Sequence, residues 1–212
     1  MRKYFSTLVL LTIAAFTYSC ADPAADKPKA STGNATTVSE SPKPAGTETL
    51  VISPQNSKVE FVASKVTKSH PGSFKQFTGK IELAPKTIPD SRVSIEIDAA
   101  SVEADDPQLT AHLKTPDFFD VAKFPKATFV STKIEPITSG TFNVTGNLEL
   151  HGVTKSITFP ANIQESADSV SVEADFAINR KDFAIVYAGK TDDLIRDNVV
   201  LKLSLKVARA KP

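Results

Sequence analysis

From residue 50 onward, hydrophobic and polar residues alternate with a period of two along most of the chain. In one such run every second residue is apolar, namely Val170, Val172, Ala174, Phe176 and Ile178. Comparable runs lie at 58–64, 93–98, 141–150, 157–163 and 199–207. Alternation of this kind gives a strand one dry face and one wet face, which is typical of antiparallel strands around a single core.

Two further apolar segments, 74–83 and 127–134, bring the predicted strands to eight, and a short segment at 50–52 adds an edge strand. Turn signals at 89–91, 139–140 and 167–169 separate several of them. Strands and helices do not alternate, so a nucleotide-binding α/β fold is not expected. The pattern predicts an all-β protein, either a closed up-and-down antiparallel barrel or a sandwich.

Residues 101–125 interrupt the alternation. Asp106 can cap a short helix with Pro107 in its first turn, and Leu109 and Leu113 share one face of that helix. Pro116 is expected to end the helix and to leave an aromatic-rich loop. A long excursion between two strands is a place for a lid over a ligand site. The alternative is that it only plugs one end of a barrel.

The N-terminus has the layout of a secretory signal peptide over residues 1–19. Arg2 and Lys3 precede the apolar run 8–16, which is too short for a transmembrane helix. Cys20, the only cysteine, lies at the expected cleavage point, as in bacterial lipoprotein signals, where the cysteine becomes lipidated. The alternative is ordinary cleavage nearby with no role for Cys20.

Residues 20–48 are rich in Pro, Ala, Ser and Thr and hold Val38 as their one large apolar residue. Such a segment cannot bury enough surface to offset its ordering entropy, so a disordered tether is predicted. The folded domain is then expected to span residues 49–212.

Charge and composition exclude several classes of function. The 25 basic and 24 acidic residues give a net charge of +1, which argues against nucleic-acid binding through bulk charge. One Cys and three scattered His residues leave little for a metal site, so no metal and no cofactor besides a bound lipid are expected. Thirteen Phe and no Trp indicate aromatic side chains that are mostly buried.

Several spaced motifs carry a family resemblance. The run HLKTPDFFDVAKFP at 112–125 resembles the "HLKSxDFFDxxKYP" signature of the YceI family. ATFVST at 127–132, VTGNLELHGVTK at 144–155, INRKDF at 178–183, and Gly72, Phe74, Phe77 and Gly79 resemble further family elements in the same order. Ala184 departs from the family pattern, because Gly is usual at that position. The resemblance implies a secreted, lipocalin-like eight-stranded antiparallel barrel that holds a long polyisoprenoid chain in characterised members.

A barrel of eight strands can hold one small ligand or be filled by its own side chains. The apolar residues expected to line a pocket lie on dry strand faces or in the lid, and each has plain core packing as its alternative. They are Phe61, Phe74, Phe77, Leu109, Leu113, Phe118, Phe119, Phe129, Phe142, Phe159, Phe176 and Phe183.

Three polar residues are candidates for contacts with a lipid head group or within the lid: His112, Lys114 and Arg180. His112 has a backbone hydrogen bond in the loop as its alternative role. Arg180 is expected to pair with Asp117 or Asp120 and so to fix the lid. His151 is expected in a hairpin turn, and the charged segment 192–197 in a solvated connection.

The leading hypothesis is a barrel that binds an isoprenoid or similar amphiphile for transport, storage or stress protection. It would be anchored to a bacterial membrane through Cys20 and face the periplasm, or be soluble there. The alternative is a filled barrel that binds a protein partner of the cell envelope. Catalysis is not expected, because the alternation places nearly all ionisable groups outside the barrel. A homodimer is a further possibility.

Overall fold

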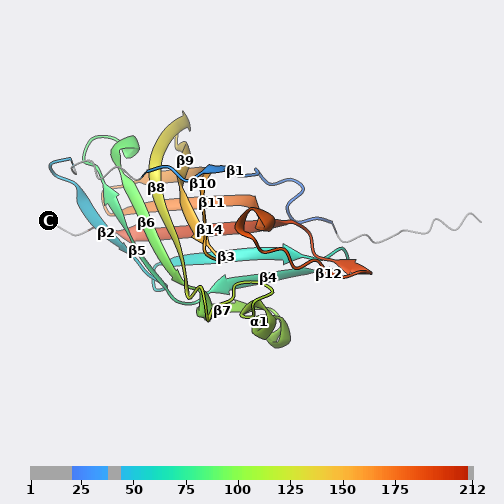
Figure 1. The fold of residues 1–212 in the computed structure, drawn as a ribbon. Helices are drawn as coiled ribbons and strands as arrows, with labels where there is room; N and C mark the ends of the chain where they lie inside the picture. Colours follow the sequence, from blue (N-terminus) through green and yellow to red (C-terminus); the bar gives the residue numbers. More distant parts are fainter. Residues whose placement is uncertain (1–20, 38–43, 210–212) are drawn as a thin grey trace, which may run out of the picture.

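The alternating segments form one curled antiparallel sheet in the computed structural model, which describes residues 21–37 and 44–209. The strands that build the curled wall are β2 (Glu48–Ile52), β3 (Ser57–Ser64), β4 (Ser69–Phe74), β5 (Phe77–Leu83), β6 (Arg92–Asp98), β7 (Val102–Ala104), β8 (Lys126–Thr138), β9 (Thr141–Leu150), β10 (Val153–Glu165), β11 (Ser169–Asn179) and β14 (Asn198–Ala208). With β1 (Ser31–Asn34) the sheet has 12 strands, and all its ladders are antiparallel (Figure 1).

Shorter elements lie between these strands. They are the 3₁₀ turns η1 (Ile88–Asp90), η2 (Ala99–Ser101) and η3 (Arg180–Phe183), the helix α1 (Pro107–Leu113), and the small hairpin of β12 (Gly189–Lys190) and β13 (Asp193–Leu194). The short helix predicted after Asp106 is therefore confirmed. Among the described residues, no helix is both long and apolar enough to cross a bilayer.

The sheet closes through two bent strands. Neighbours follow the order β2-β5-β6-β8-β9-β10-β11-β14-β3-β4-β7, and Lys75 and Gln76 alone separate β4 from β5. At this corner the Lys75 amide donates to the Ser101 carbonyl at 3.1 Å, and the Asp98 amide donates to the Gln76 carbonyl at 3.0 Å. The two ends of the strand order are thus joined by the continuous stretch of chain that forms β4 and β5, and the sheet curls into a barrel.

The predicted fold class is confirmed, and the strand count differs for a local reason. Taking β4 with β5 and β6 with β7 as single bent strands leaves the eight predicted strands, with β2 as the extra edge strand. At both bends the inward alternation changes phase, because the inward side chains step from Phe74 to Phe77 and from Ala99 to Val102. Alternation therefore predicts the wall of the barrel but not its corners.

The N-terminal segment corrects the prediction of a disordered tether, because residues 21–37 are ordered on the barrel wall. β10 pairs with β11 over Asn162–Glu165 and with β1 over Lys155–Thr158, so β1 lies where β11 has left β10. The Ala30 amide donates to the Ala177 carbonyl of β11 at 2.8 Å. Backbone hydrogen bonds hold a strand whose side chains are all exposed, and apolar content therefore did not reveal it. The predicted signal peptide and Cys20 lie outside the described residues.

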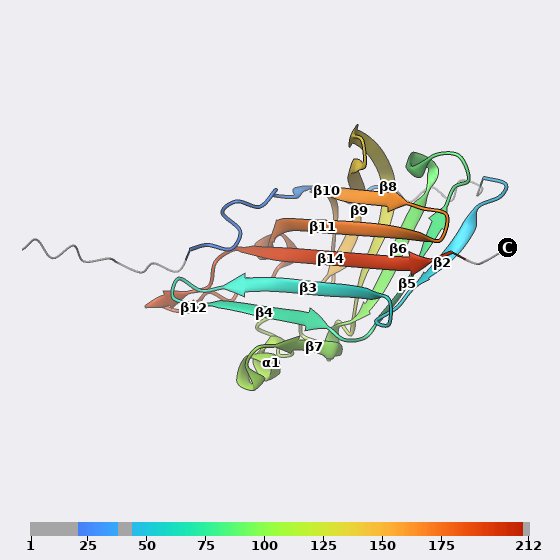
Figure 2. The ribbon, with the colours of Figure 1, turned by 180° about the vertical axis from the view of Figure 1, so that it is seen from behind.

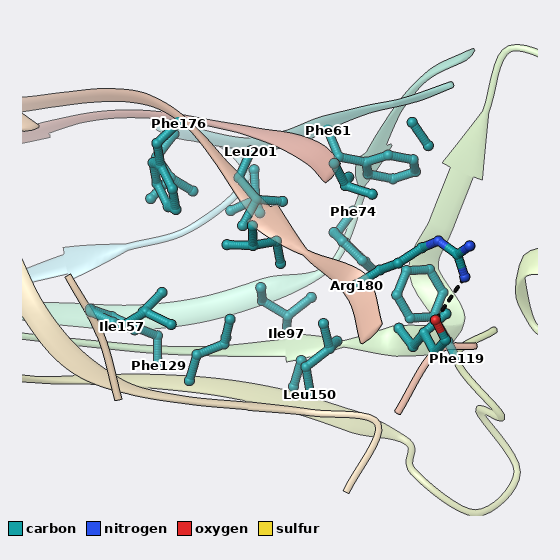
Figure 3. Close-up of a pocket in the computed structure, with 18 of the residues that line it drawn as sticks. Phe61, Phe74, Ile97, Phe119, Phe129, Leu150, Ile157, Phe176, Arg180 and Leu201 are labelled. Atoms are coloured by element: carbon teal, nitrogen blue, oxygen red, sulfur yellow. Dashed lines mark hydrogen bonds between the residues drawn. The ribbon is translucent and has the colours of Figure 1, made fainter. Parts of the chain in front are cut away.

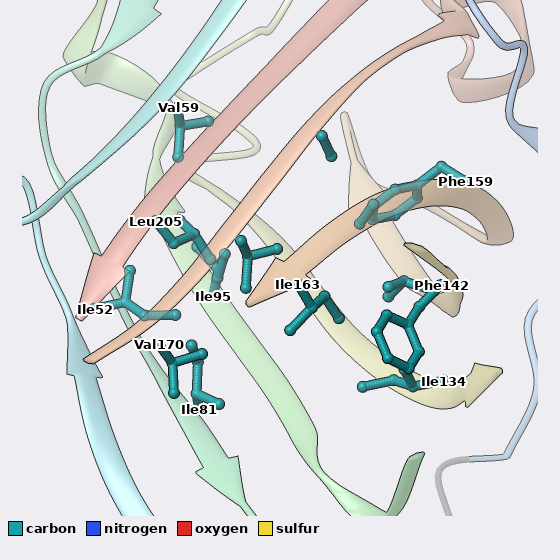
Figure 4. Close-up of a cluster of buried hydrophobic side chains, with 14 of the residues drawn as sticks. Ile52, Val59, Ile81, Ile95, Ile134, Phe142, Phe159, Ile163, Val170 and Leu205 are labelled. Atoms are coloured by element: carbon teal, nitrogen blue, oxygen red, sulfur yellow. The ribbon is translucent and has the colours of Figure 1, made fainter. Parts of the chain in front are cut away.

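One end of the barrel is filled by a continuous apolar core. Ile52, Leu205, Val170 and Ile163 are each at most 7 % exposed and interdigitate with Ile81, Ile134 and Phe142 (Figure 4). These side chains come from strands on all sides of the barrel, so the packed end joins the sheet into one unit. The packing density of such a core leaves no room for a ligand.

Candidate functional site

The other end of the barrel encloses a cavity of about 150 Å³. Every side chain that lines it is apolar except that of Arg180 (Figure 3). The wall residues come from the inward faces of the strands and include Val59, Ala63, Ile95, Ile97, Ala127, Leu148, Leu150, Ile157, Ile178, Val199, Leu201 and Leu203, together with aromatic residues. An apolar cavity of this size stays dry and binds a small apolar group.

Along single strands, the inward-facing side chains pass from the packed core to the wall of the cavity. On β14, Leu205 is buried at the packed end, whereas Leu203 and Leu201 on the same face keep exposed area because they face the cavity. Ile163 and Ile157 on β10 are buried, and Ile157 lines the cavity. The same alternating pattern therefore builds both a packed core and a hollow.

Glycines on the wall make room for rings. A Cβ on Gly146 of β9 would lie 2.4 Å from the ring of Phe129, and a Cβ on Gly72 of β4 would lie 2.2 Å from the ring of Phe61. Both rings lie against bare backbone and line the cavity. A larger residue at either glycine would push its ring out of place.

Phenylalanines separate the cavity from the packed core. Phe159 stacks on Phe176 with ring centroids 4.1 Å apart, and Phe129 lies 5.7 Å from Phe159 in a tilted arrangement. All three line the cavity and also contact the main core cluster. Nearer the covered end, Phe74 contacts Phe61 and Phe119 at centroid distances of 5.8 and 5.6 Å.

Two segments, 105–125 and 184–197, cover the cavity and are together called the cover below. In the first, the Asp106 carboxylate caps α1 by accepting from the Gln108 and Leu109 amides at 2.7 and 3.0 Å. These backbone hydrogen bonds lower the pKa of Asp106. The helix and its loop then present Leu113, Phe118 and Phe119 to the cavity.

Arg180 holds the second segment of the cover. Its side chain reaches the cavity end of the barrel (Figure 3). Its Nε donates to the Arg196 carbonyl at 3.1 Å, Nη1 to the Ile185 carbonyl at 2.7 Å, and Nη2 to the Ile195 carbonyl at 3.3 Å. Burial lowers the pKa of this guanidinium, and the charge of Asp197, 3.4 Å from Nη2, opposes that shift. Ile185 and Ile195 are thereby placed against the cavity.

The pairing predicted for Arg180 is therefore wrong, because its ionic partner is Asp197 and not Asp117 or Asp120. Asp117 accepts instead from His112, whose Nε2 lies 2.8 Å from the Asp117 carboxylate. The prediction that 192–197 is a solvated connection is also corrected at Ile195. The segment after Arg180 folds back, so that the carbonyls of Ile185, Ile195 and Arg196 accept from its guanidinium. The sequence gives no sign of this compact loop.

Eight of the twelve predicted pocket residues line the cavity: Phe61, Phe74, Leu113, Phe118, Phe119, Phe129, Phe159 and Phe176. Four do not. Phe142 belongs to the packed end, and Phe77 and the fully buried Phe183 pack within the main cluster. Leu109 lies one turn before Leu113 and packs on the outer side of the Phe118 cluster.

The polar candidates lie outside the cavity, with the exception of Arg180. The His112 ring packs edge-on against Phe118 and Tyr187, with centroids 4.9 and 5.2 Å away. Lys114 is the C-terminal cap of α1 and is half-buried. His151 has a φ of 52° in the turn between β9 and β10, as predicted. No cluster of His, Cys, Asp or Glu suited to a metal ion occurs in the part of the chain that the structure describes.

Reasoning from aromatic residues missed the aliphatic half of the wall. Ile97, Leu148, Leu150, Leu201 and Leu203 all lie on predicted dry faces, and the alternation alone places them inside. No pattern in the sequence indicates Ile185 or Ile195, because they lie in an irregular segment that Arg180 folds inward.

A closed antiparallel barrel around an apolar hollow is the architecture of small-ligand carriers such as the lipocalins. The model of the YceI-like domain family matches residues 50–207, and the chain belongs to that family. Ala184, where the family resemblance leads one to expect Gly, has a φ of 58°, the left-handed conformation that glycine adopts most easily.

The relatives are bacterial. A UPF0312 protein of Vibrio parahaemolyticus is 40 % identical over 90 residues, which cover 42 % of this chain and 48 % of the relative. Protein YceI of Salmonella arizonae is 35 % identical over 120 residues, which cover 54 % of this chain and 62 % of the relative. The chain thus spans about half the length of the Vibrio relative that it matches.

Solved structures share the fold. BcnA of Burkholderia cenocepacia has a TM-score of 0.67 at 25 % identity and covers 73 % of this chain and 98 % of its own. The Campylobacter jejuni YceI protein has a TM-score of 0.60 at 26 % identity and covers 66 % and 85 %. A polyisoprenoid binding domain from Saccharophagus degradans has a TM-score of 0.62 at 19 % identity, covers 77 % and 99 %, and shows the likeness in fold.

Proposed function

We propose that this protein binds the tail of an isoprenoid or a similar amphiphilic lipid in the cavity and acts in lipid transport, lipid storage or stress protection. The observation that carries the proposal is an apolar hollow in a barrel whose other end is fully packed. A polyisoprenoid binding domain of the same fold supports the choice of ligand class.

The energetics suit binding without catalysis. Burial of apolar surface contributes about 25 cal/mol per Å², or about 0.8 kcal/mol per buried carbon group, so one isoprene unit contributes roughly 4 kcal/mol. A cavity of about 150 Å³ takes an apolar group of roughly the size of benzene. A longer tail therefore requires the cover to move outward, with Phe119 and Leu113 as the side chains nearest to the new volume.

The head group of such a lipid would remain at the covered end, near His112 in the last turn of α1 and Lys114 at its C-terminal cap. We place the protein in the bacterial envelope, facing the periplasm and anchored by a lipid on Cys20. The signal-like sequence and the single cysteine at its end support this location. Several acyl chains on one residue give stable anchoring, whereas one chain binds only marginally.

Native mass spectrometry of protein purified without detergent tests the proposal. The wild-type chain is expected to carry an extractable lipid or to take up an added polyprenyl phosphate. Ala127→Leu, which points a larger side chain into the cavity, is expected to lose most of that lipid. Ala208→Leu adds the same group on the exposed end of β14 and serves as the matched control.

Protein that carries no lipid and takes none up would contradict the proposal. Equal lipid occupancy in Ala127→Leu and Ala208→Leu would contradict the cavity as the site. In that case the alternative of a barrel that binds a protein partner through its surface would gain support.

A further inference from the structure

The chain enters the folded domain at the covered end of the barrel. Asp22, two positions after Cys20, lies with its carboxylate 3.7 Å from the guanidinium of Arg196. Arg196 follows Ile195, which lines the cavity. Both views of the ribbon show the start of the described chain at the same end as the β12–β13 hairpin (Figures 1 and 2).

This entry point is fixed by packing. Ala24 is 1 % exposed and packs against Ala177 and Val200 on the outer face of the wall. Lys27 forms an ion pair with Asp175, and the Ala177 amide donates to the Pro28 carbonyl at 2.8 Å. The docked segment lies before the part of the chain that the family model matches.

Exposed apolar side chains surround the same end. Val66, Val186 and Leu194 are 48, 65 and 49 % exposed. The Val66 amide donates to the Leu194 carbonyl at 3.1 Å, so these two residues are neighbours across two loops. Val186 lies between Ile185, which lines the cavity, and Tyr187, which packs on Phe118. These three residues are called the rim below.

Two ion pairs lie near the rim. Lys65 lies 3.0 Å from Asp193, and Lys181 lies 3.0 Å from Asp197. Paired charges weaken any net electrostatic attraction to an anionic surface, while the exposed valine and leucine side chains gain from leaving water. The rim is therefore suited to contact with an apolar phase, and not to contact governed by charge.

We propose that the rim rests on a lipid bilayer, so that the covered end of the barrel faces the membrane. The proposal depends on the proposed function and on the anchor at Cys20, because the docked segment would bring that anchor to the covered end. A bilayer is the occupant that both features fit, since acyl chains on Cys20 and apolar rim residues would enter the same surface. A lipid tail would then pass between membrane and cavity without crossing water.

The chain has no Trp, so a single introduced Trp is a clean reporter of this contact. The full chain, produced with its leader, would carry Val66→Trp, Val186→Trp or Leu194→Trp and be reconstituted into vesicles of phosphatidylethanolamine and phosphatidylglycerol with brominated acyl chains. Val51→Trp and Ile137→Trp are matched controls, because these residues are 61 and 49 % exposed but lie on β2 and at the end of β8.

The rim tryptophans are expected to lose most of their emission to bromine quenching, and the two control tryptophans to keep theirs. The same quenching is expected in vesicles of phosphatidylethanolamine and phosphatidylcholine, which lack anionic lipid. Ala24→Asp, which places a charge in the buried docking site, is expected to reduce quenching at the rim by loosening the segment that sets the orientation.

Equal quenching of rim and control tryptophans, or quenching that needs anionic lipid, would overturn the proposal. The mass of the same sample reports acylation of Cys20, and a non-acylated chain with unquenched rim positions would overturn it as well. Lipid in the cavity is measured separately by native mass spectrometry. An empty cavity with a quenched rim would contradict the proposed function alone, and a filled cavity with an unquenched rim would contradict only the orientation.

Discussion

The two ends of the barrel are built by the same strands and differ in what closes them. At the packed end, branched side chains from β2, β5, β8, β10, β11 and β14 meet in the middle (Figure 4). At the cavity end, the strands meet a cover made of irregular segments, and a hollow remains beneath it (Figure 3). The wall therefore supplies a uniform apolar interior, and the closure decides where that interior is filled.

This difference predicts unequal costs for one substitution at two sites on β14. Leu205→Ala opens a new cavity in the packed end and is expected to lower the free energy of unfolding by about 4 kcal/mol. Leu203→Ala enlarges an existing hollow and is expected to cost about 1–2 kcal/mol, below the usual range, because Leu203 already lacks contacts on one side. Urea denaturation of both variants measures the two values.

The effects of the two substitutions on lipid binding should follow the opposite order, with the larger effect from Leu203→Ala. Leu203→Ala is expected to change which tails are bound, and Leu205→Ala to leave binding unchanged in the fraction that remains folded. Equal losses of stability with equal effects on lipid binding would remove the distinction between the two ends.

Arg180 is the single residue on which the closure of the cavity end most depends. Arg180→Met keeps most of the buried stem but leaves the carbonyls of Ile185, Ile195 and Arg196 without their donor. We expect the free energy of unfolding to fall by about 3 kcal/mol, because buried acceptors without a donor are costly. We also expect faster exchange of bound lipid, measured by transfer to acceptor vesicles.

Lys181→Met, which removes the exposed partner of the same Asp197, is the control for Arg180→Met and is expected to change stability by less than about 1 kcal/mol. A stable Arg180→Met variant with unchanged lipid exchange would show that the loop closes without the guanidinium.

A smaller effect is expected from acid. The pKa of Asp106 is lowered by the amides that it caps, and the pKa of Asp193 is lowered by hydrogen bonds from Lys65 and Thr67. A carboxylate whose pKa is lower in the folded state stabilises the fold at pH values above its ordinary pKa of 3.8. This stabilisation is lost as the pH falls through the lower pKa of the folded state. Both groups belong to the cover, so acid should loosen the cavity end first.

Amide hydrogen exchange across this acid range checks the expectation. The amides of Gln108 and Leu109 donate to the Asp106 carboxylate. They should lose protection from exchange before the amides of Val170 and Val172 on β11. Simultaneous loss at both ends would mean that the cover and the packed core open as one unit.

Much of the wall was predictable because a period of two reports directly which side chains point inward. The dry faces that include Phe129, Phe159, Phe176 and Leu201 follow from alternation alone. The cap at Asp106 was equally predictable, because a short acceptor followed by Pro107 is a local signal.

The distinction between core and cavity was not predictable, since Phe142 and Phe129 have the same pattern and differ only in how far along the barrel they lie. The pairing of β1 with β10 rests on backbone groups, and the acceptors that fold Ile195 onto the Arg180 guanidinium are main-chain carbonyls. Main-chain donors and acceptors are the same for every residue type apart from proline, so the sequence carries no signal of them.

The central claim is that the cavity end binds a lipid tail. A crystal structure of protein purified from bacteria without detergent tests it most directly. The account predicts continuous elongated density between Phe129, Leu201 and Phe119, with the cover displaced outward where the density leaves the barrel. A cavity that is empty in protein saturated with polyprenyl phosphate, with the cover unmoved, would contradict it.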